Sequence, residues 1–250
     1  MQDKQLIGKS HIIPEFMYQD LFDNKHKIYV FSPYAKLQGQ ERIKRPSSGE
    51  YENGLLCADC DNKLLGSYED YASKAIYGGE LPANECPTCE NYENQHGVKF
   101  TGCKNISYKK FKIFLLSVLW RSSISSRPLF SEISLGPHEE IIRKMIYEGN
   151  PGEASDYPIF FMTFVNDKSM SKDIIAQPQR RRTKDGHSMF VFMIGGMLYC
   201  FYVNARNHTL PEYVVTETIK PTNDMNIFHI PPGQGWDIIL GFMGLKRNSH

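Results

Sequence analysis

The chain has 250 residues, 41% of them hydrophobic, which excludes a disordered protein and allows one large domain or two small ones. Its net charge of +1 excludes attraction of nucleic acid by total charge, so a nucleic-acid partner would need a local basic patch. The most apolar stretches, 111–120 and 189–203, are short and interrupted, and the N-terminus has no apolar signal region. We therefore expect a cytoplasmic protein with no membrane span.

Residues 1–104 are rich in Gly, Pro, Asn and Asp, a composition typical of loops. A small domain with so few apolar windows usually needs a metal ion to hold it together. One helix is predicted after Cys60, and Gly78 and Gly79 end it. The apolar residues that share one face of this helix are Leu64, Leu65, Tyr68, Ala72 and Ile76.

Beyond residue 104 the pattern changes. An amphipathic helix is predicted over 108–125, and a second helix begins near Pro137 and ends at Gly149. The apolar stripe of the first helix comprises Phe111, Phe114, Leu115, Val118 and Leu119. Aromatic and β-branched residues then predict strands over 157–165, 187–203 and 227–230, with a hairpin turn at Gly195-Gly196. We predict an α+β protein with two domains, 1–104 and 105–250, the second having two helices and an antiparallel sheet.

Four of the six cysteines form two CxxC pairs, Cys57/Cys60 and Cys86/Cys89. In a reducing compartment two such pairs indicate a closed, structural zinc site more than two disulfides. The alternative is a pair of reduced, metal-free motifs. Cys103 and Cys200 have no CxxC partner, and Cys200 lies in an apolar run typical of a buried thiol.

Two short motifs carry the chemistry. The segment Lys9-Ser10-His11-Ile-Ile-Pro predicts a short strand with an imidazole at its edge, and the segment Asn53-Gly-Leu-Leu-Cys-Ala-Asp-Cys leads into the predicted helix. In this order the segments resemble the HNH endonuclease family, over roughly residues 9–75, and in particular uncharacterised bacterial HNH-like proteins. The resemblance implies a treble-clef, ββα-metal fold, in which a hairpin and a helix surround a catalytic divalent ion.

The resemblance also implies a role for each matched residue. His11 matches the general base that takes a proton from water, and Asn53 matches the residue that orients it. Asp61 stands where the family has His or Asn as a ligand, and a carboxylate suits catalytic Mg²⁺ or Mn²⁺. Ser10 stands where the family often has an acidic or His ligand, so a further acid is needed. Glu69, eight residues after Asp61, is the candidate; the alternative is a solvated carboxylate.

Basic residues are the remaining candidates for contact with nucleic acid. Arg42, Lys44 and Arg45 lie between the two motifs, where a loop facing DNA would lie. The run Arg180-Arg181-Arg182 with Lys184 is denser, but a solvated loop between strands is the favoured interpretation there.

The leading hypothesis is a metal-dependent endonuclease that hydrolyses DNA, with a role in bacterial defence suggested by where HNH-like proteins are common. The alternative is a catalytically inactive zinc module that binds nucleic acid or a protein. A third hypothesis is a structural zinc protein whose C-terminal strands bind a partner. The sequence leaves open RNA as the substrate, a protein partner and self-association.

Overall fold

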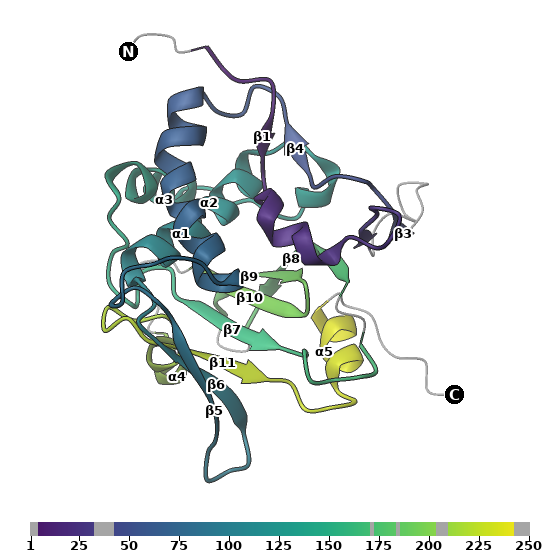
Figure 1. The fold of residues 1–250 in the computed structure, drawn as a ribbon, viewed down its shortest axis with the longest axis vertical. Helices are drawn as coiled ribbons and strands as arrows, with labels where there is room; N and C mark the ends of the chain where they lie inside the picture. The colour runs from purple at the N-terminus through teal and green to yellow at the C-terminus, as the bar shows by residue number, and fades with distance from the viewer. Residues whose placement is uncertain (1–4, 33–42, 171–172, 184–185, 204–209, 243–250) are drawn as a thin grey trace.

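The computed structural model describes residues 5–32, 43–170, 173–183, 186–203 and 210–242, and they form an α+β fold (Figure 1). Its largest element is a nine-stranded sheet in the order β3-β2-β8-β9-β10-β7-β11-β6-β5. The strands are β2 (Tyr29–Phe31), β3 (Ile43–Lys44), β5 (Thr88–Glu93), β6 (Lys99–Lys104), β7 (Ile159–Thr163), β8 (Ile174–Arg182), β9 (Ser188–Ile194), β10 (Met197–Val203) and β11 (Met225–His229).

The expected antiparallel sheet is correct for most strand pairs and wrong for two. β7 and β11 run parallel, as do β2 and β8. Both parallel pairs join strands that are distant in sequence, so no local turn signal could have revealed them. The predicted hairpin is confirmed, because β9 and β10 pair across Gly195-Gly196, and both glycines have positive φ.

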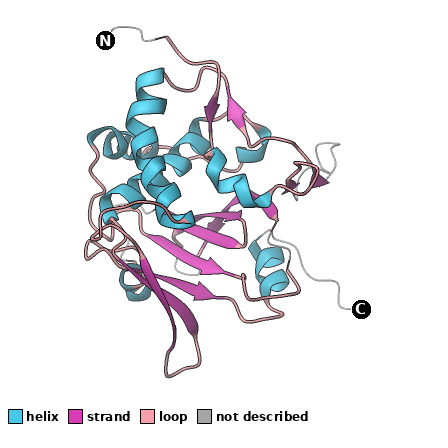
Figure 2. Ribbon diagram, viewed as in Figure 1, coloured by secondary structure: helices cyan, strands magenta, loops and turns pink. Residues whose placement is uncertain are grey.

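The three long helices match the predictions, and they gather on one side of the large sheet (Figure 2). They are α1 (Gly66–Tyr77), α2 (Tyr108–Ile124) and α3 (His138–Glu148). The shorter helices are η1 (Glu15–Leu21), η3 (Asp59–Leu65), η4 (Pro128–Phe130), α4 (Glu212–Thr216) and α5 (Gly235–Phe242). The π-helical η3 runs directly into α1, so the helix predicted after Cys60 extends from Asp59 to Tyr77.

The helix α2 is more deeply buried than its predicted stripe required. All five residues of that stripe are buried, but so are Lys112, Ser117 and Arg121 on other faces. Each buried cation must find partners within the protein, because an unpaired buried charge is costly. α2 is therefore a central helix rather than a surface helix, and its polar residues mark the places where other segments are attached to it.

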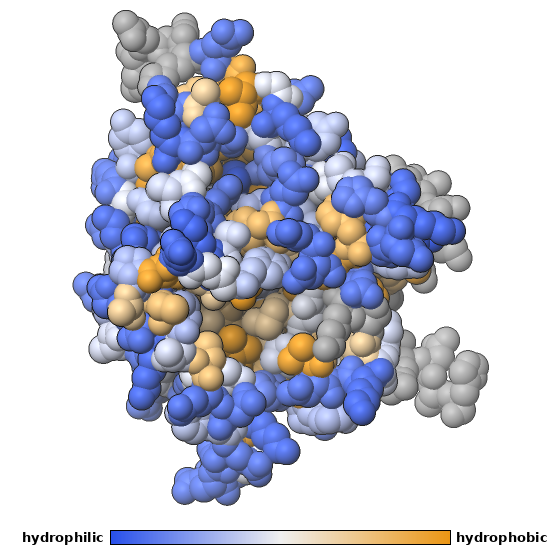
Figure 3. Space-filling view, in the orientation of Figure 1, coloured by the Kyte–Doolittle hydropathy of each residue, from blue (hydrophilic) through white to orange (hydrophobic). Residues whose placement is uncertain are grey.

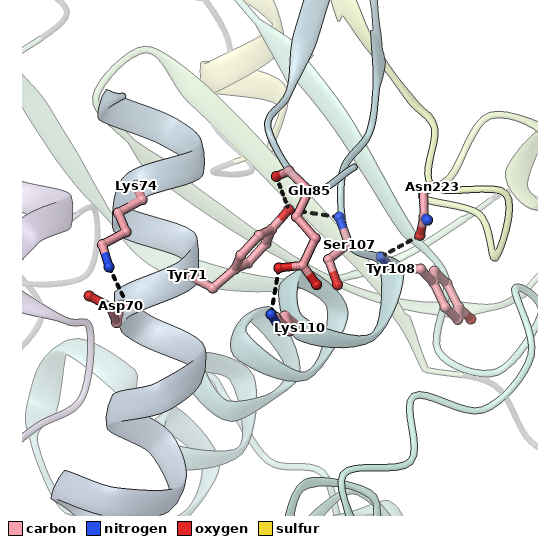
Figure 4. Close-up of polar contacts among 8 residues, drawn as sticks. All are labelled: Asp70, Tyr71, Lys74, Glu85, Ser107, Tyr108, Lys110 and Asn223. Atoms are coloured by element: carbon pink, nitrogen blue, oxygen red, sulfur yellow. Dashed lines mark hydrogen bonds and ion pairs between the residues drawn. The ribbon is translucent and has the colours of Figure 1, made fainter. Parts of the chain in front are cut away.

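One such attachment lies at the N-terminal end of α2 (Figure 4). The Tyr71 hydroxyl on α1 accepts a hydrogen bond of 2.7 Å from the amide of Ser107, and it donates one of 3.3 Å to the main-chain oxygen of Glu85. Lys110 of α2 forms an ion pair of 2.5 Å with the Glu85 carboxylate. These contacts fix the loop before β5 against the middle of α1.

The predicted division after residue 104 is not seen as a boundary in the structure. β2, β3, β5 and β6 come from the first predicted domain and lie in the same sheet as strands of the second. One core cluster also contains residues of both halves, such as Ile12, Ala72, Phe114 and Phe201. The apparent shortage of apolar windows in residues 1–104 is thus met by packing on the rest of the chain.

The opposite face of the sheet carries a second apolar cluster, which includes Phe164, Val191 and Cys200. The prediction of Cys200 as a buried thiol is confirmed, since it is 1% exposed. The surface seen in Figure 3 is mainly hydrophilic, with apolar residues in separate patches. Among the described residues, none of the helices has the length and apolar content needed to cross a bilayer.

Candidate active site

The two motif segments come together as a small sheet and a helix. β1 (Ser10–His11) pairs antiparallel with β4 (Tyr51–Glu52), so that Ser10 faces Glu52 and His11 faces Tyr51 across the strands. After β4 the chain turns at Gly54, where φ is +73°, and a bridge between Leu6 and Cys57 leads into η3. The sequence folds this way because Ile12 and Ile13 are fully buried next to β1, which anchors the strand in the core.

His11 is half-buried and surrounded by acidic residues. Its imidazole Nε2 lies 4.0 Å from a carboxylate oxygen of Glu15 on η1, and it interacts electrostatically with Glu69 and Asp61. Burial lowers the pKa of His11 below its usual 6.5, and the charge of Lys9 lowers it further, while the three carboxylates oppose this shift. The imidazole is consequently neutral at pH 7, which is the state that a general base needs.

Asp61, in η3, provides the carboxylate that faces β1. Burial raises its pKa above the usual value, whereas the charge of Arg121, the nearby Ser10 hydroxyl and the charge of His11 oppose that rise. The Ser10 side chain is fully buried. Ser10, which stands at a ligand position of the family pattern, therefore lies near the Asp61 carboxylate, and its Oγ has no hydrogen-bond partner among the described residues.

Arg121 of α2 is part of this site, although it belongs to neither sequence motif. The residue is 1% exposed; Nη1 donates a hydrogen bond of 2.7 Å to the main-chain oxygen of His11, and Nη2 lies 2.8 Å from a carboxylate oxygen of Glu69. The available signal was an arginine within an apolar helical segment, since buried charges are usually paired. Glu69 is thus located near His11 as expected, but as one half of an ion pair.

Tyr51 and Lys9 form the exposed rim beside His11. The Tyr51 ring lies edge-on to the imidazole with centroids 6.4 Å apart, and Lys9 Nζ lies 4.8 Å from the centre of the same ring. The Tyr51 side chain is 40% exposed. A cation and an aromatic ring next to a neutral imidazole give this rim the chemistry to contact a phosphate and a base or sugar.

Asn53 directly follows β4 in the chain. It is exposed in the turn that follows β4, two residues beyond Tyr51, the residue that pairs with His11. The ring of His11 is instead flanked by Tyr51, and its main-chain oxygen is held by Arg121. A role for Asn53 in orienting the imidazole remains a prediction.

Lys44 and Arg45, two of the predicted basic residues, lie outside the small sheet. Arg42 falls outside the described residues, and Lys44 is in β3, at one edge of the nine-stranded sheet. Arg45 forms an ion pair with Asp23, and its guanidinium lies 4.6 Å from the centre of the Tyr29 ring. The triple Arg is not in a loop, because residues 180–182 form the end of β8 and pair with β9.

The four predicted zinc ligands do not come together in this structure. Cys57 and Cys60 lie at the start of η3, while Cys86 is exposed and close enough to Tyr71 to affect its pKa. Tyr71 lies eleven positions after Cys60 along the same continuous helix, roughly 16 Å at 1.5 Å per residue. Cys89 forms a disulfide with Cys103, its direct neighbour across β5 and β6. Cys103 therefore has a partner, which corrects its prediction as an unpartnered thiol, and Cys89 is bonded to it in this structure. The four-cysteine zinc site remains a prediction.

The residues around His11 fit a loosely held divalent ion better than a closed metal cage. Within the described part of the chain, no three His, Cys, Asp or Glu side chains are arranged to hold a metal ion. Asp61 supplies one half-buried carboxylate, whereas Glu69 is paired with Arg121. Mg²⁺ is often bound through one or two carboxylates together with substrate phosphates, so this donor set suits an ion that is bound with its substrate.

Comparisons of the chain with protein-family models, with curated proteins and with solved structures found no match. The function must therefore be inferred from the geometry of the site itself.

Proposed function

We propose that the protein is a metal-dependent phosphodiester hydrolase of the HNH type that acts on DNA, with His11 as its general base. The observation that carries this proposal is the convergence of His11 on β1 with Asp61 on η3, beside the two-stranded sheet formed by β1 and β4. Two strands followed by a helix, with an imidazole and a carboxylate between them, is the arrangement that the resemblance implies. The choice of DNA over RNA rests on that resemblance alone.

Each residue of the site has a defined task in this reaction. The neutral imidazole of His11 accepts a proton from the attacking water, and the neighbouring carboxylates stabilise the imidazolium that results. Asp61 would hold the divalent ion, which supplies charge stabilisation at the scissile phosphate when bound. Lys9 and Tyr51 are placed at the rim to contact the nucleic-acid strand.

The proposal is tested by plasmid cleavage with Mg²⁺, Mn²⁺ or EDTA. We expect metal-dependent cleavage that His11→Ala reduces at least about a hundredfold, the usual contribution of a general base. Tyr77→Phe, a change on α1 at a partly exposed residue, is the matched control and should cleave normally. Equal cleavage by the wild type and His11→Ala would show that His11 is not the base.

A catalytically inactive binding module is the second candidate. It is favoured by the ion pair between Glu69 and Arg121, which leaves Asp61 with few partner ligands in the described residues. This candidate predicts DNA binding that Lys9→Ala and Tyr51→Ala weaken, with no cleavage under any metal condition. Binding measured by fluorescence anisotropy, in parallel with the cleavage assay, separates the two candidates.

A further inference from the structure

Arg121 joins three segments at the candidate site. Its Nη1 holds the main-chain oxygen of His11 on β1 at 2.7 Å, its Nη2 lies 2.8 Å from Glu69 on α1, and its Nε and Nη2 donate to Ser117 one turn earlier on α2. The contacts to Ser117 orient the guanidinium before it meets the other two segments. Arg121 is thus fixed on all sides, and its position does not depend on a bound ligand.

The burial of Arg121 also determines what Glu69 can do. A buried guanidinium without a counter-ion is strongly destabilising, so Arg121 requires a carboxylate partner. The structure supplies Glu69, whose side chain is 25% exposed, in direct ion-pair contact. The fixed Arg121 therefore competes for the Glu69 carboxylate with any cation that enters from the solvent side.

We propose that Arg121 is a positioning residue that keeps Glu69 out of the coordination sphere of the divalent ion while it holds the His11 strand in place. The inference rests on the proposed function, because it concerns the same ion. It implies that the Arg121–Glu69 pair, whose charges cancel, borders the site without binding the ion. The ion is then bound by Asp61 without Glu69, and its affinity in the absence of substrate is weak.

The test measures Mn²⁺ affinity directly by electron paramagnetic resonance, with Mn²⁺ alone as the probe and no nucleic acid. Asp61→Asn should weaken Mn²⁺ binding. Arg121→Met releases Glu69 and should tighten binding at least about fivefold, because a second carboxylate ligand is gained. Arg121→Met with Glu69→Gln replaces the pair by neutral side chains and should bind Mn²⁺ within about threefold of the wild type.

Lys112→Met is the matched control for the loss of a buried cation, because Lys112 is on the same helix, is equally buried and contacts a different part of the chain. It should leave Mn²⁺ affinity unchanged. Should Arg121→Met fail to fold, as judged by circular dichroism, Arg121→Gln takes its place, since it also removes the charge that holds Glu69 and should show the same tightening.

Two results would overturn the inference without affecting the proposed function. One is a double variant that loses Mn²⁺ binding as severely as Asp61→Asn, which would make Glu69 a ligand. The other is a folded Arg121→Met variant with unchanged affinity. A failure of the proposed function looks different, because the wild type and Asp61→Asn would then bind Mn²⁺ equally or not at all.

Discussion

Arg121 and His11 are 110 residues apart in the chain, yet the arginine side chain donates a 2.7 Å hydrogen bond to the main-chain oxygen of the histidine. The contact crosses the position where the sequence predicted a domain boundary. It makes the helix α2 a structural support of the small sheet that carries the imidazole. The candidate site and the rest of the chain therefore depend on one core.

This dependence predicts that residues 1–104 do not fold alone. The fragment would lose α2, with Arg121, and it would lose the strands β8 and β11 on which β2 and β6 pair. Its buried apolar residues, such as Ile12 and Ala72, would be exposed to water. We expect no cooperative unfolding transition for the fragment, measured by circular dichroism against the full chain. A dispersed amide NMR spectrum from the fragment would contradict the single-core interpretation.

Elements that depend on local periodicity and on turn glycines could be predicted from the sequence. Helix α3 ends at Gly149, which adopts the left-handed conformation expected of such a glycine, and the Gly195-Gly196 turn joins two strands as predicted. The convergence of His11 and Asp61 could be anticipated only through the family resemblance, because no local pattern relates residues fifty positions apart.

Other features depend on long-range pairing and could not be predicted. β5 is exposed along its whole length and has no alternating apolar pattern, so only its pairing with β6 makes it a strand. The position of Cys86 relative to Cys60 depends on the length and direction of the intervening helix rather than on cysteine spacing. Arg121 was missed because its partners, His11 and Glu69, lie on other elements.

Lys9→Ala should raise the pKa of His11. The positive charge of Lys9 disfavours the imidazolium, so its removal makes protonation easier. Cleavage requires the neutral imidazole and falls as the pH drops through this pKa, so its acid limb should move to higher pH in the variant. The pKa itself is measured by NMR titration of the His11 ring protons, assigned with His11→Ala. Lys9→Arg keeps the charge, so His11 should titrate in that variant as it does in the wild type. An unchanged His11 pKa in Lys9→Ala would show that the charge of Lys9 does not act on the imidazole.

The buried Lys112 should make the free energy of unfolding depend on pH, independently of the candidate site. Burial lowers the pKa of Lys112 from 10.5 to about 7, although Asp156 and Glu153 oppose the shift. Between these two values the unfolded chain binds a proton that the folded chain lacks, so the free energy of unfolding contributed by Lys112 rises with pH. Below pH 7 both states are protonated, and the full cost of burying the charge is present.

Lys112→Met should remove this dependence. The variant has no titrating group at that position, so its free energy of unfolding should rise less between pH 7 and pH 10 than that of the wild type. The Tyr108 hydroxyl would keep its hydrogen bond of 2.9 Å to the main-chain oxygen of Gly152. Urea denaturation at several pH values provides the comparison. Parallel stability curves for the two proteins would mean that Lys112 has an ordinary pKa in the folded state.

The disulfide between Cys89 and Cys103 should stabilise the folded chain. It joins β5 to β6 across a sequence separation of 14 residues, and closing a loop of that size stabilises a protein by about 3 kcal/mol in the chain-entropy estimate. Reduction, or the variant Cys89→Ser, should lower the free energy of unfolding by about that amount. Cys86→Ser is the control, because Cys86 is free and exposed, and it should leave stability unchanged.

Peptide mapping under non-reducing conditions identifies the bond directly, and elemental analysis measures zinc in the same sample. A Cys89–Cys103 peptide with no bound zinc is the expected result. Stoichiometric zinc that is lost in Cys57→Ser and in Cys86→Ser alike would instead restore the four-cysteine site. It would require the loop before β5 to move from Tyr71 toward the start of η3, breaking the contacts that Glu85 makes with Tyr71 and Lys110.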